Sequence, residues 1–467
     1  MGPKNFPEGA SHHLGAARLI KSFDQTFSKV WLPAGPPEVR PVLIILILSV
    51  VGFVSYLVIE TIVLNRRLRS IPLRICVTGT RGKSSVVRMI ASVLREEGKQ
   101  VLAKTTGTKA SYILPGGEEV VVRRRGVVSI IEQKKLVKKA FRLNVECLVA
   151  EIMSIHPENH VIEAQRLLKP HIVVLTNVRR DHTGAMCERV RARSPYTPAT
   201  WWPTPKDHRS VKNSSQKNRT FIDTIIEEIA AVYASDIAEE STLFIPGEEN
   251  NDIFEKAVKH AGGKLIPVKK GLPARIAPEM KQHFFPDNIS LVHAVGKHLA
   301  IDKNTIINGL RKTAYDSGEF KVWLTKSEET KKTYYTANAF AANDPESTFH
   351  IISELHKQLP VSPGNLIGLL NLRADRGDRT LQWLETLREG GSDHFKQLYL
   401  TGTHARAVGR KLKNAVVLQH KEPEKIMAAI TRNIVEDEAV IFGFGNIKGA
   451  GALLVEHWKK TGVEYGL

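Results

Sequence analysis

The stretch that decides the fold runs from Leu73 to Ser85: Leu-Arg-Ile-Cys-Val-Thr-Gly-Thr-Arg-Gly-Lys-Ser-Ser. The apolar run from Ile75 to Val77 predicts a buried strand, and the apolar period of Val86, Ile90 and Val93 predicts a helix. A strand, a glycine turn and a helix N-terminus bring free backbone N–H groups and the positive end of a helix dipole to one point. The stretch therefore predicts an α/β fold that binds a phosphate at this loop.

Two side chains of the loop strengthen this prediction. Lys83 adds a full positive charge, and Ser84 offers a hydroxyl that can ligate Mg²⁺ beside a phosphate. The spacing is the shorter Gly-Thr-x-Gly-Lys-Ser form, because Val77 stands where the usual motif has its first glycine. The alternative, a tight turn with a surface lysine, is disfavoured because strand, glycines, Lys-Ser pair and helix all occur in order. The expected nucleotide-binding residues here are Gly79, Thr80, Arg81, Gly82, Lys83, Ser84 and Ser85.

Composition limits the class of protein. The chain has 467 residues, 42% hydrophobic and 25% charged, which excludes wholesale disorder and leaves room for two or three domains. Its formal net charge of +19 favours a polyanionic partner without choosing among nucleic acid, anionic lipid and an acidic polymer. Cys76, Cys147 and Cys187 form no C-x-x-C pair, which argues against a disulfide framework and a cysteine zinc site.

A membrane anchor is predicted before the loop. Pro41 to Leu64 is nearly all apolar, with only Glu60 charged, and is long enough to span a bilayer. Four arginines follow it: Arg66, Arg67, Arg69 and Arg74. The positive-inside rule then places the rest of the chain in the cytoplasm, as a single-pass protein of the cell membrane. A signal peptide would start earlier and a buried core helix would be shorter. Residues 1–40 are predicted to be a poorly ordered extension.

From Leu73 onward, strand and helix patterns alternate, as in domains with parallel sheets. We expect a nucleotide-binding domain over residues 71–312 and a smaller Rossmann-like α/β domain over residues 313–467. The segment from Cys187 to Arg219 breaks the pattern with prolines, a Trp-Trp pair and many basic residues. It can bind single-stranded nucleic acid or an anionic surface, but an irregular insertion without function is the favoured interpretation.

Polar residues follow two of the predicted strands. Glu151 ends the apolar run that starts at Val145, and Asp181 and His182 come shortly after the run that ends at Thr176. Because parallel strands end at one edge of a sheet, these side chains are expected near the phosphate loop, where carboxylates can hold the Mg²⁺ of a nucleotide. The alternative for Asp181 and His182, a loop cap, is about as plausible when the other motifs are set aside.

Together, these stretches resemble the Mur ligase superfamily, and most closely the catalytic subunits of poly-γ-glutamate synthases. The resemblance covers roughly Leu57 to the C-terminus. The motifs that carry it in the first half are Gly79 to Ser84, Thr105 to Thr108, Glu132 to Lys134, Glu151 with Met153, and Asn177 with Asp181-His182. Those in the second half are Pro286 to Asn288, Ala341 to Asp344 with Ser347-Thr348, Arg373 to Arg376 with Asp378-Arg379, and Gly443 to Ile447.

The resemblance implies ATP-dependent amide formation through an acyl phosphate, with ATP and Mg²⁺ (or Mn²⁺) as cofactors. It implies catalytic roles for Lys83, Asp181, His182, Arg373 and Asp375. It adds Asn288, Lys321 and Asp344 to the nucleotide-binding residues, and gives Ser84, Thr106, Glu151 and His182 as metal-binding residues. Arg373, Arg376 and Arg379 suit bidentate recognition of the carboxylates of glutamate or a polyglutamate chain. The implied partners are membrane subunits of a synthase complex, and no nucleic acid is expected.

The chain departs from relatives in two ways. Lys321 stands where relatives have an arginine, so a phosphate contact there would be a point charge and not a fork. Some Mur ligases use a carbamylated lysine, and its counterpart is not identifiable here. Other functions remain open: a ligase acting on folate or a cell-wall precursor, a membrane-tethered ATPase or kinase acting on an anionic polymer, and an interaction protein that ATP only regulates.

Overall fold

The computed structural model describes residues 39–107, 110–124, 126, 128–181, 183–187, 221–271, 286–314, 320–326, 332–342 and 344–466. The predicted extension before residue 39, His182 and the predicted insertion after Cys187 lie outside the described residues. The chain divides into two compact units, with the boundary between Arg66 and Arg67. The predicted boundary between residues 312 and 313 stays a prediction.

The first unit contains most of one long helix, α2 (Val39–Arg69). Its segment Pro41–Arg69 is long and apolar enough to cross a membrane, by length and composition. The helix begins two residues earlier and ends five residues later than the predicted span from Pro41 to Leu64, because its last turn runs on into the arginines.

An eight-stranded mixed sheet occupies the first part of the second unit, in the order β4-β3-β2-β5-β1-β6-β7-β8. Its central parallel strands are β2 (Val101–Thr105), β5 (Cys147–Glu151), β1 (Leu73–Thr78) and β6 (Ile172–Leu175). Two further parallel strands, β7 (Thr242–Pro246) and β8 (Lys264–Val268), extend one side. An antiparallel pair, β3 (Ser111–Ile113) and β4 (Glu119–Val121), forms the opposite edge of the sheet. The predicted strands at the glycine loop and before Glu151 are therefore confirmed.

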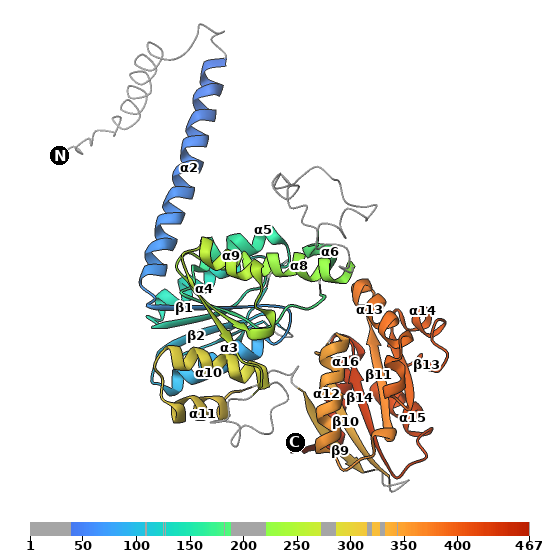
Figure 1. Ribbon diagram of the computed structural model, residues 1–467. Helices are drawn as coiled ribbons and strands as arrows, with labels where there is room; N and C mark the ends of the chain where they lie inside the picture. The colour runs from blue at the N-terminus through green and yellow to red at the C-terminus, as the bar shows by residue number, and fades with distance from the viewer. Residues whose placement is uncertain are drawn as a thin grey trace, which may run out of the picture. The chain divides into compact units, whose positions relative to one another are not determined.

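Helices cover both faces of this sheet (Figure 1). One face carries α3 (Lys83–Glu96), α10 (Pro286–His298) and α11 (Lys303–Arg311), which share an apolar core with β1. The other carries α4 (Glu132–Arg142), α5 (Pro157–Val161), which continues as a π-helix (Ile162–Leu168), α8 (Phe221–Ala234) and α9 (Asp252–His260). Because β1 lies between β5 and β6, the loops after these three strands meet at one edge, where open parallel sheets bind ligands.

A second mixed sheet follows, with the order β13-β12-β11-β14-β10-β9-β15. Its parallel strands are β13 (Ala415–Val417), β12 (Gln397–Gly402), β11 (Leu366–Leu372), β14 (Glu438–Phe444) and β10 (Thr333–Ala339). The antiparallel strands β9 (Lys321–Lys326) and β15 (Val463–Tyr465) form one side. The predicted second α/β unit is thus present.

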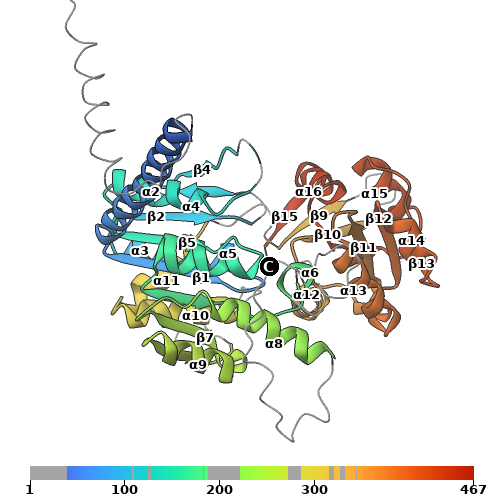
Figure 2. The ribbon, with the colours of Figure 1, turned by 90° about the horizontal axis from the view of Figure 1, so that it is seen from above.

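This sheet also lies between two layers of helices (Figure 2). On one face, α12 (Pro345–Gln358) and α13 (Gly377–Arg388) pack on a core that includes Trp383 and Phe444. On the other, α15 (Pro423–Thr431) and α16 (Ala450–Thr461) pack around Trp458. The short α14 (Ala405–Gly409) follows β12. Asp344 caps α12 and Pro345 begins it: the Asp344 carboxylate accepts a hydrogen bond from the Ser347 amide at 2.9 Å.

Candidate active site

The glycine loop joins β1 to α3 in a conformation that only glycine adopts easily. Gly79 has φ of 117° and Gly82 has φ of 81°. A Cβ atom at Gly79 would lie 2.4 Å from the Thr176 hydroxyl oxygen of the neighbouring strand end. Gly82 is the N-cap of α3 and has no side chain to occupy the first amides of the helix. The amides at the start of α3 therefore have no partner within the helix, which is the chemistry that a phosphate needs.

Replacing Gly79 with alanine should weaken nucleotide binding about tenfold, because both the backbone strain of positive φ and the contact with Thr176 oppose the loop conformation. The binding of a fluorescent ATP analogue to the full chain measures this effect. Gly98→Ala is the matched control, since Gly98 also has positive φ (82°) but its Cβ would meet nothing within 4 Å. Equal effects of the two substitutions would contradict a specific role for the Gly79 contact.

Lys83 begins α3, and its ammonium turns back over the loop. It donates to the carbonyl oxygen of Gly79 and lies 3.4 Å from that of Thr80. Burial lowers the pKa of the Lys83 ammonium, and the nearby Glu151 carboxylate opposes that shift. A half-buried ammonium that donates to carbonyl oxygens can exchange these weak partners for phosphate oxygens.

Ser84, Thr106 and Glu151 come together beside the loop. The Ser84 hydroxyl and the Thr106 backbone amide both donate to Glu151 Oε2 at 2.7 Å. Because both contacts fall on one carboxylate oxygen, the other oxygen and the Ser84 hydroxyl suit a hard divalent cation. Of the described side chains, no group of three or more His, Cys, Asp and Glu residues could hold a metal ion.

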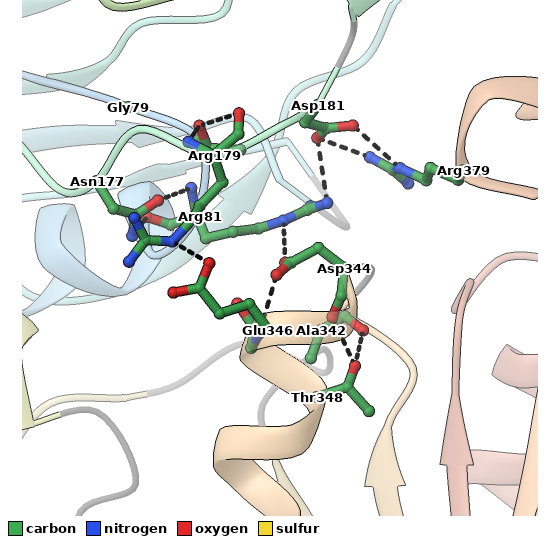
Figure 3. Close-up of polar contacts among 12 residues, drawn as sticks. Gly79, Arg81, Asn177, Arg179, Asp181, Ala342, Asp344, Glu346, Thr348 and Arg379 are labelled. Carbon is green, nitrogen blue, oxygen red and sulfur yellow. Dashed lines mark hydrogen bonds and ion pairs between the residues drawn. The ribbon is translucent and has the colours of Figure 1, made fainter. Parts of the chain in front are cut away.

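Arg81, in the middle of the loop, reaches toward the second sheet (Figure 3). Its guanidinium pairs with Asp344 at 3.0 Å and with Asp181 at 3.1 Å. Asp181 in turn accepts two hydrogen bonds from Arg379 of α13, at 3.2 Å and 3.0 Å. Burial lowers the pKa of Arg81, but the two carboxylates outweigh burial and raise its net pKa. Two arginines and two aspartates thus form a charge-balanced, nearly buried cluster between the two sheets.

A second set of ion pairs lies beside this cluster. Arg179, which follows β6, contacts Glu346 of α12 at 2.9 Å (Figure 3). It also contacts Glu249 at 2.7 Å. The backbone of Arg81 is fixed by Asn177, whose amide side chain accepts from the Arg81 N–H at 3.0 Å and donates to the Arg81 carbonyl at 3.2 Å. The loop, the end of β6 and the start of α12 are therefore tied to one another by polar contacts.

The cluster borders a cavity of about 1160 Å³ that reaches both sheets. From the loop side it is lined by Lys83, Ser84 and Glu151, and from the other side by Arg373 and Arg376. The structure thus brings most predicted site residues around one space. An acidic substrate held by the arginines would face a nucleotide held by the loop.

Several predicted residues are engaged with protein partners. Arg379 and Asp344 bind carboxylate or guanidinium groups of the cluster, as described above. Arg373 pairs with Asp375 at 2.6 Å, and Lys321 pairs with Glu464 at 2.6 Å. Asn288 lies against the loop, with its amide nitrogen 2.8 Å from where a Cβ of Gly82 would be. Their assigned roles toward nucleotide and substrate stay predictions, as do those of Thr106 and of His182, which lies outside the described residues.

Sequence reasoning gave Glu132 to Lys134 only as a family motif and missed Lys104 and Glu163, the buried residues that this motif contacts. Lys104 is completely buried in β2 and pairs with Glu132 at 3.2 Å, while the neighbouring Gln133 donates to the buried Glu163. A lysine inside an apolar strand was the signal for this pair, because a buried charge needs a partner. Arg179, Glu249 and Glu346 carried no such signal, since they become neighbours only in the folded chain.

Comparison with known proteins identifies the family. Residues 324–461 match the poly-gamma-glutamate synthase CapB C-terminal domain, and residues 77–189 match the Mur ligase middle domain. The chain is similar to the CapB proteins and to the Mur ligase superfamily. The recognition made from its motifs is confirmed.

Two curated relatives and one solved structure illustrate this likeness. The chain is 30% identical over 327 residues to the capsule biosynthesis protein CapB of Bacillus anthracis, and the match covers 68% of this chain but only 61% of that protein. It is 26% identical over 407 residues to the PGA synthase CapB of Bacillus subtilis (strain 168), covering 84% and 91%. The bifunctional folylpolyglutamate synthase/dihydrofolate synthase of Yersinia pestis, complexed with AMPPNP and Mn ion, superimposes with a TM-score of 0.54 at 12% identity, covering 85% and 92%. That last similarity shows the fold alone.

Proposed function

We propose that the protein is an ATP-dependent ligase that joins glutamate units through γ-glutamyl amide bonds. One observation carries this proposal: a phosphate loop with Lys83, Ser84 and Glu151 shares a cavity with Arg373 and Arg376 of the second sheet. An ATPase that acts on ATP alone would need only the loop. The facing arginines provide recognition for a carboxylate, which is the group that an acid–amino-acid ligase must activate.

The reaction proceeds in two steps. A carboxylate oxygen of glutamate or of the growing chain attacks the γ-phosphorus of ATP, the bond to the β-phosphate oxygen breaks, and ADP and an acyl phosphate form. The amine of the next glutamate, having lost a proton, then attacks the acyl carbon, and the C–O bond to phosphate breaks as phosphate leaves. The attacking nitrogen loses a second proton to solvent or a nearby base, which leaves a neutral amide with one N–H.

The residues have defined roles in these steps. Loop amides and Lys83 stabilise the negative charge of the migrating phosphoryl group. Ser84 and Glu151 would hold a divalent cation, which supplies Lewis-acid stabilisation of the phosphate charge. Arg373 and Arg376 orient the carboxylate. The cluster of Arg81, Asp181, Asp344 and Arg379 between the two sheets keeps the second sheet over the cavity and so protects the acyl phosphate from water.

The setting of the reaction follows from α2. A single-pass anchor with arginines after it favours a catalytic unit on the cytoplasmic face of the cell membrane. Membrane subunits of a synthase complex are the expected partners. The positive charge is accounted for by the acidic substrate and polymer, so nucleic acid is not needed as a ligand.

The proposal is tested with the full chain in lipid nanodiscs, given ATP, Mg²⁺ and glutamate. ADP release should depend on glutamate, and the product should contain amides at the γ-carboxyl, as NMR would detect. Folate and cell-wall precursors replace glutamate in parallel reactions, and they should not support ADP release without it. ADP release at the same rate with and without glutamate would favour the ATPase or kinase alternative and refute the ligase.

A further inference from the structure

A buried histidine–aspartate pair lies behind the phosphate loop. His160 of α5 is 1% exposed and Asp236, just after α8, is fully buried. The His160 Nδ1 atom lies 2.9 Å and 3.0 Å from the two carboxylate oxygens of Asp236. Since a carboxylate only accepts, Nδ1 is the donor in this contact. The Asp236 carboxylate also accepts a hydrogen bond of 2.5 Å from the Thr78 hydroxyl.

The pair is connected to both sides of Gly79. Thr78 is the last residue of β1 and immediately precedes Gly79. Thr80 follows Gly79, and its hydroxyl lies 3.2 Å from that of Tyr233, which is in α8. The Tyr233 and His160 rings pack edge to face with centroids 5.8 Å apart. The two threonines that flank the first loop glycine are therefore held by one cluster of three side chains.

The charge of Asp236 makes its partner important. A buried carboxylate close behind a phosphate site repels the phosphates unless a neighbour compensates it. Asp236 is close enough to Lys83 to oppose the lowering of the Lys83 pKa by burial. His160 is the titratable group that contacts Asp236 directly. The other titratable groups around the pair are Tyr233, Glu163 and Cys76. Burial raises the pKa of each of these three groups, and the charge of Asp236 raises it further.

The other ring nitrogen of His160 points to a link with the ligand site. Among the described residues, His160 Nε2 is buried and has no hydrogen-bond partner. His160 nevertheless lines the same cavity as Gly79 and Lys83. Buried polar atoms are nearly always paired in folded proteins, so an unpaired one beside a ligand cavity indicates a functional constraint on this side chain.

We propose that His160 is a positioning residue for nucleotide binding: together with Asp236 it fixes the phosphate loop through Thr78 and compensates the buried carboxylate behind it. This inference rests on the proposed function only in that the loop binds ATP. It assigns roles to two residues outside the Lys83, Ser84 and Glu151 set, and neither has to touch the nucleotide.

The experiment measures binding of a fluorescent ATP analogue with Mg²⁺ to the full chain in nanodiscs. His160→Leu removes the Nδ1 donor, leaves Thr78 as the hydrogen-bond donor to the Asp236 carboxylate described above, and should raise Kd at least tenfold. His160→Asn places an amide N–H near the position of Nδ1 and should stay within threefold of the unchanged protein. The double variant His160→Leu, Asp236→Asn removes the charge as well and should recover most of the lost affinity. His260→Leu, at the exposed end of α9, is the matched control and should bind normally.

Folding of each variant is verified by thermal unfolding. An unchanged Kd in folded His160→Leu, or a double variant that binds more weakly than His160→Leu, would overturn the proposal. If His160→Leu does not fold, Thr78→Val tests the same link, with at least a threefold rise in Kd expected and an unchanged Kd overturning it. Because the readout is nucleotide binding, it stands apart from the glutamate-dependent assay, and the two failures are distinguishable.

Discussion

Lys83→Ala is expected to reduce glutamate-dependent ADP release about a thousandfold or more. The ammonium is half-buried, and its partners in the structure are the loop carbonyls of Gly79 and Thr80, so it is placed to balance charge on a phosphoryl group in transfer. Alanine removes that charge without filling the loop. The rate of ADP release at saturating ATP and glutamate measures the effect.

The matched control for this substitution is Lys99→Ala. Lys99 follows α3, the helix that Lys83 begins, and pairs with Glu146 at 3.1 Å. Both side chains are exposed, and such surface ion pairs contribute little to stability. Its activity should remain within about twofold of the unchanged protein. Substantial turnover by Lys83→Ala would remove the glycine loop from the mechanism.

Arg379→Ala should lower kcat about a hundredfold while nucleotide affinity changes little. Arg379 comes from α13 and makes two hydrogen bonds to Asp181, so its loss leaves a buried carboxylate with Arg81 alone and weakens the link between the sheets. The loop that binds ATP does not depend on it. Steady-state kinetics and binding of an ATP analogue separate the two effects.

A double-mutant cycle tests directly whether Arg379 acts through its contact with Asp181. Arg379→Ala and Asp181→Ala should be strongly non-additive in kcat, with a coupling of about 2 kcal/mol or more, because they remove the same buried contact. Arg388→Ala, at the exposed C-terminal end of α13, is the control and should have little effect. Additive effects, with Arg379→Ala raising mainly the KM for glutamate, would instead favour the sequence-based role of Arg379 as a substrate contact.

The sequence was sufficient for features that depend on local pattern. The strand before Gly79, the glycine turn and the helix from Lys83 follow from periodicity and backbone chemistry. Glu151 could be placed near the loop because parallel strands end at one sheet edge. Each of these inferences needs only neighbours in sequence or a general rule of sheet geometry.

Partner choice between distant residues could not be predicted in this way. Arg81 was expected to bind nucleotide, yet its side chain pairs with Asp181 and with Asp344, which lies 263 residues further along the chain. A charged side chain in a loop has many candidate partners, and only the packed fold decides among them. The same holds for Asp236, whose contact with Thr78 spans 158 residues.

The most direct test of the ligase mechanism follows oxygen atoms. Glutamate labelled with ¹⁸O in its carboxylates is incubated with the full chain, ATP and Mg²⁺, and the released phosphate is analysed by mass spectrometry. Activation through an acyl phosphate predicts one ¹⁸O atom in phosphate for each amide bond formed. Phosphate released without ¹⁸O while amide bonds accumulate would contradict the account.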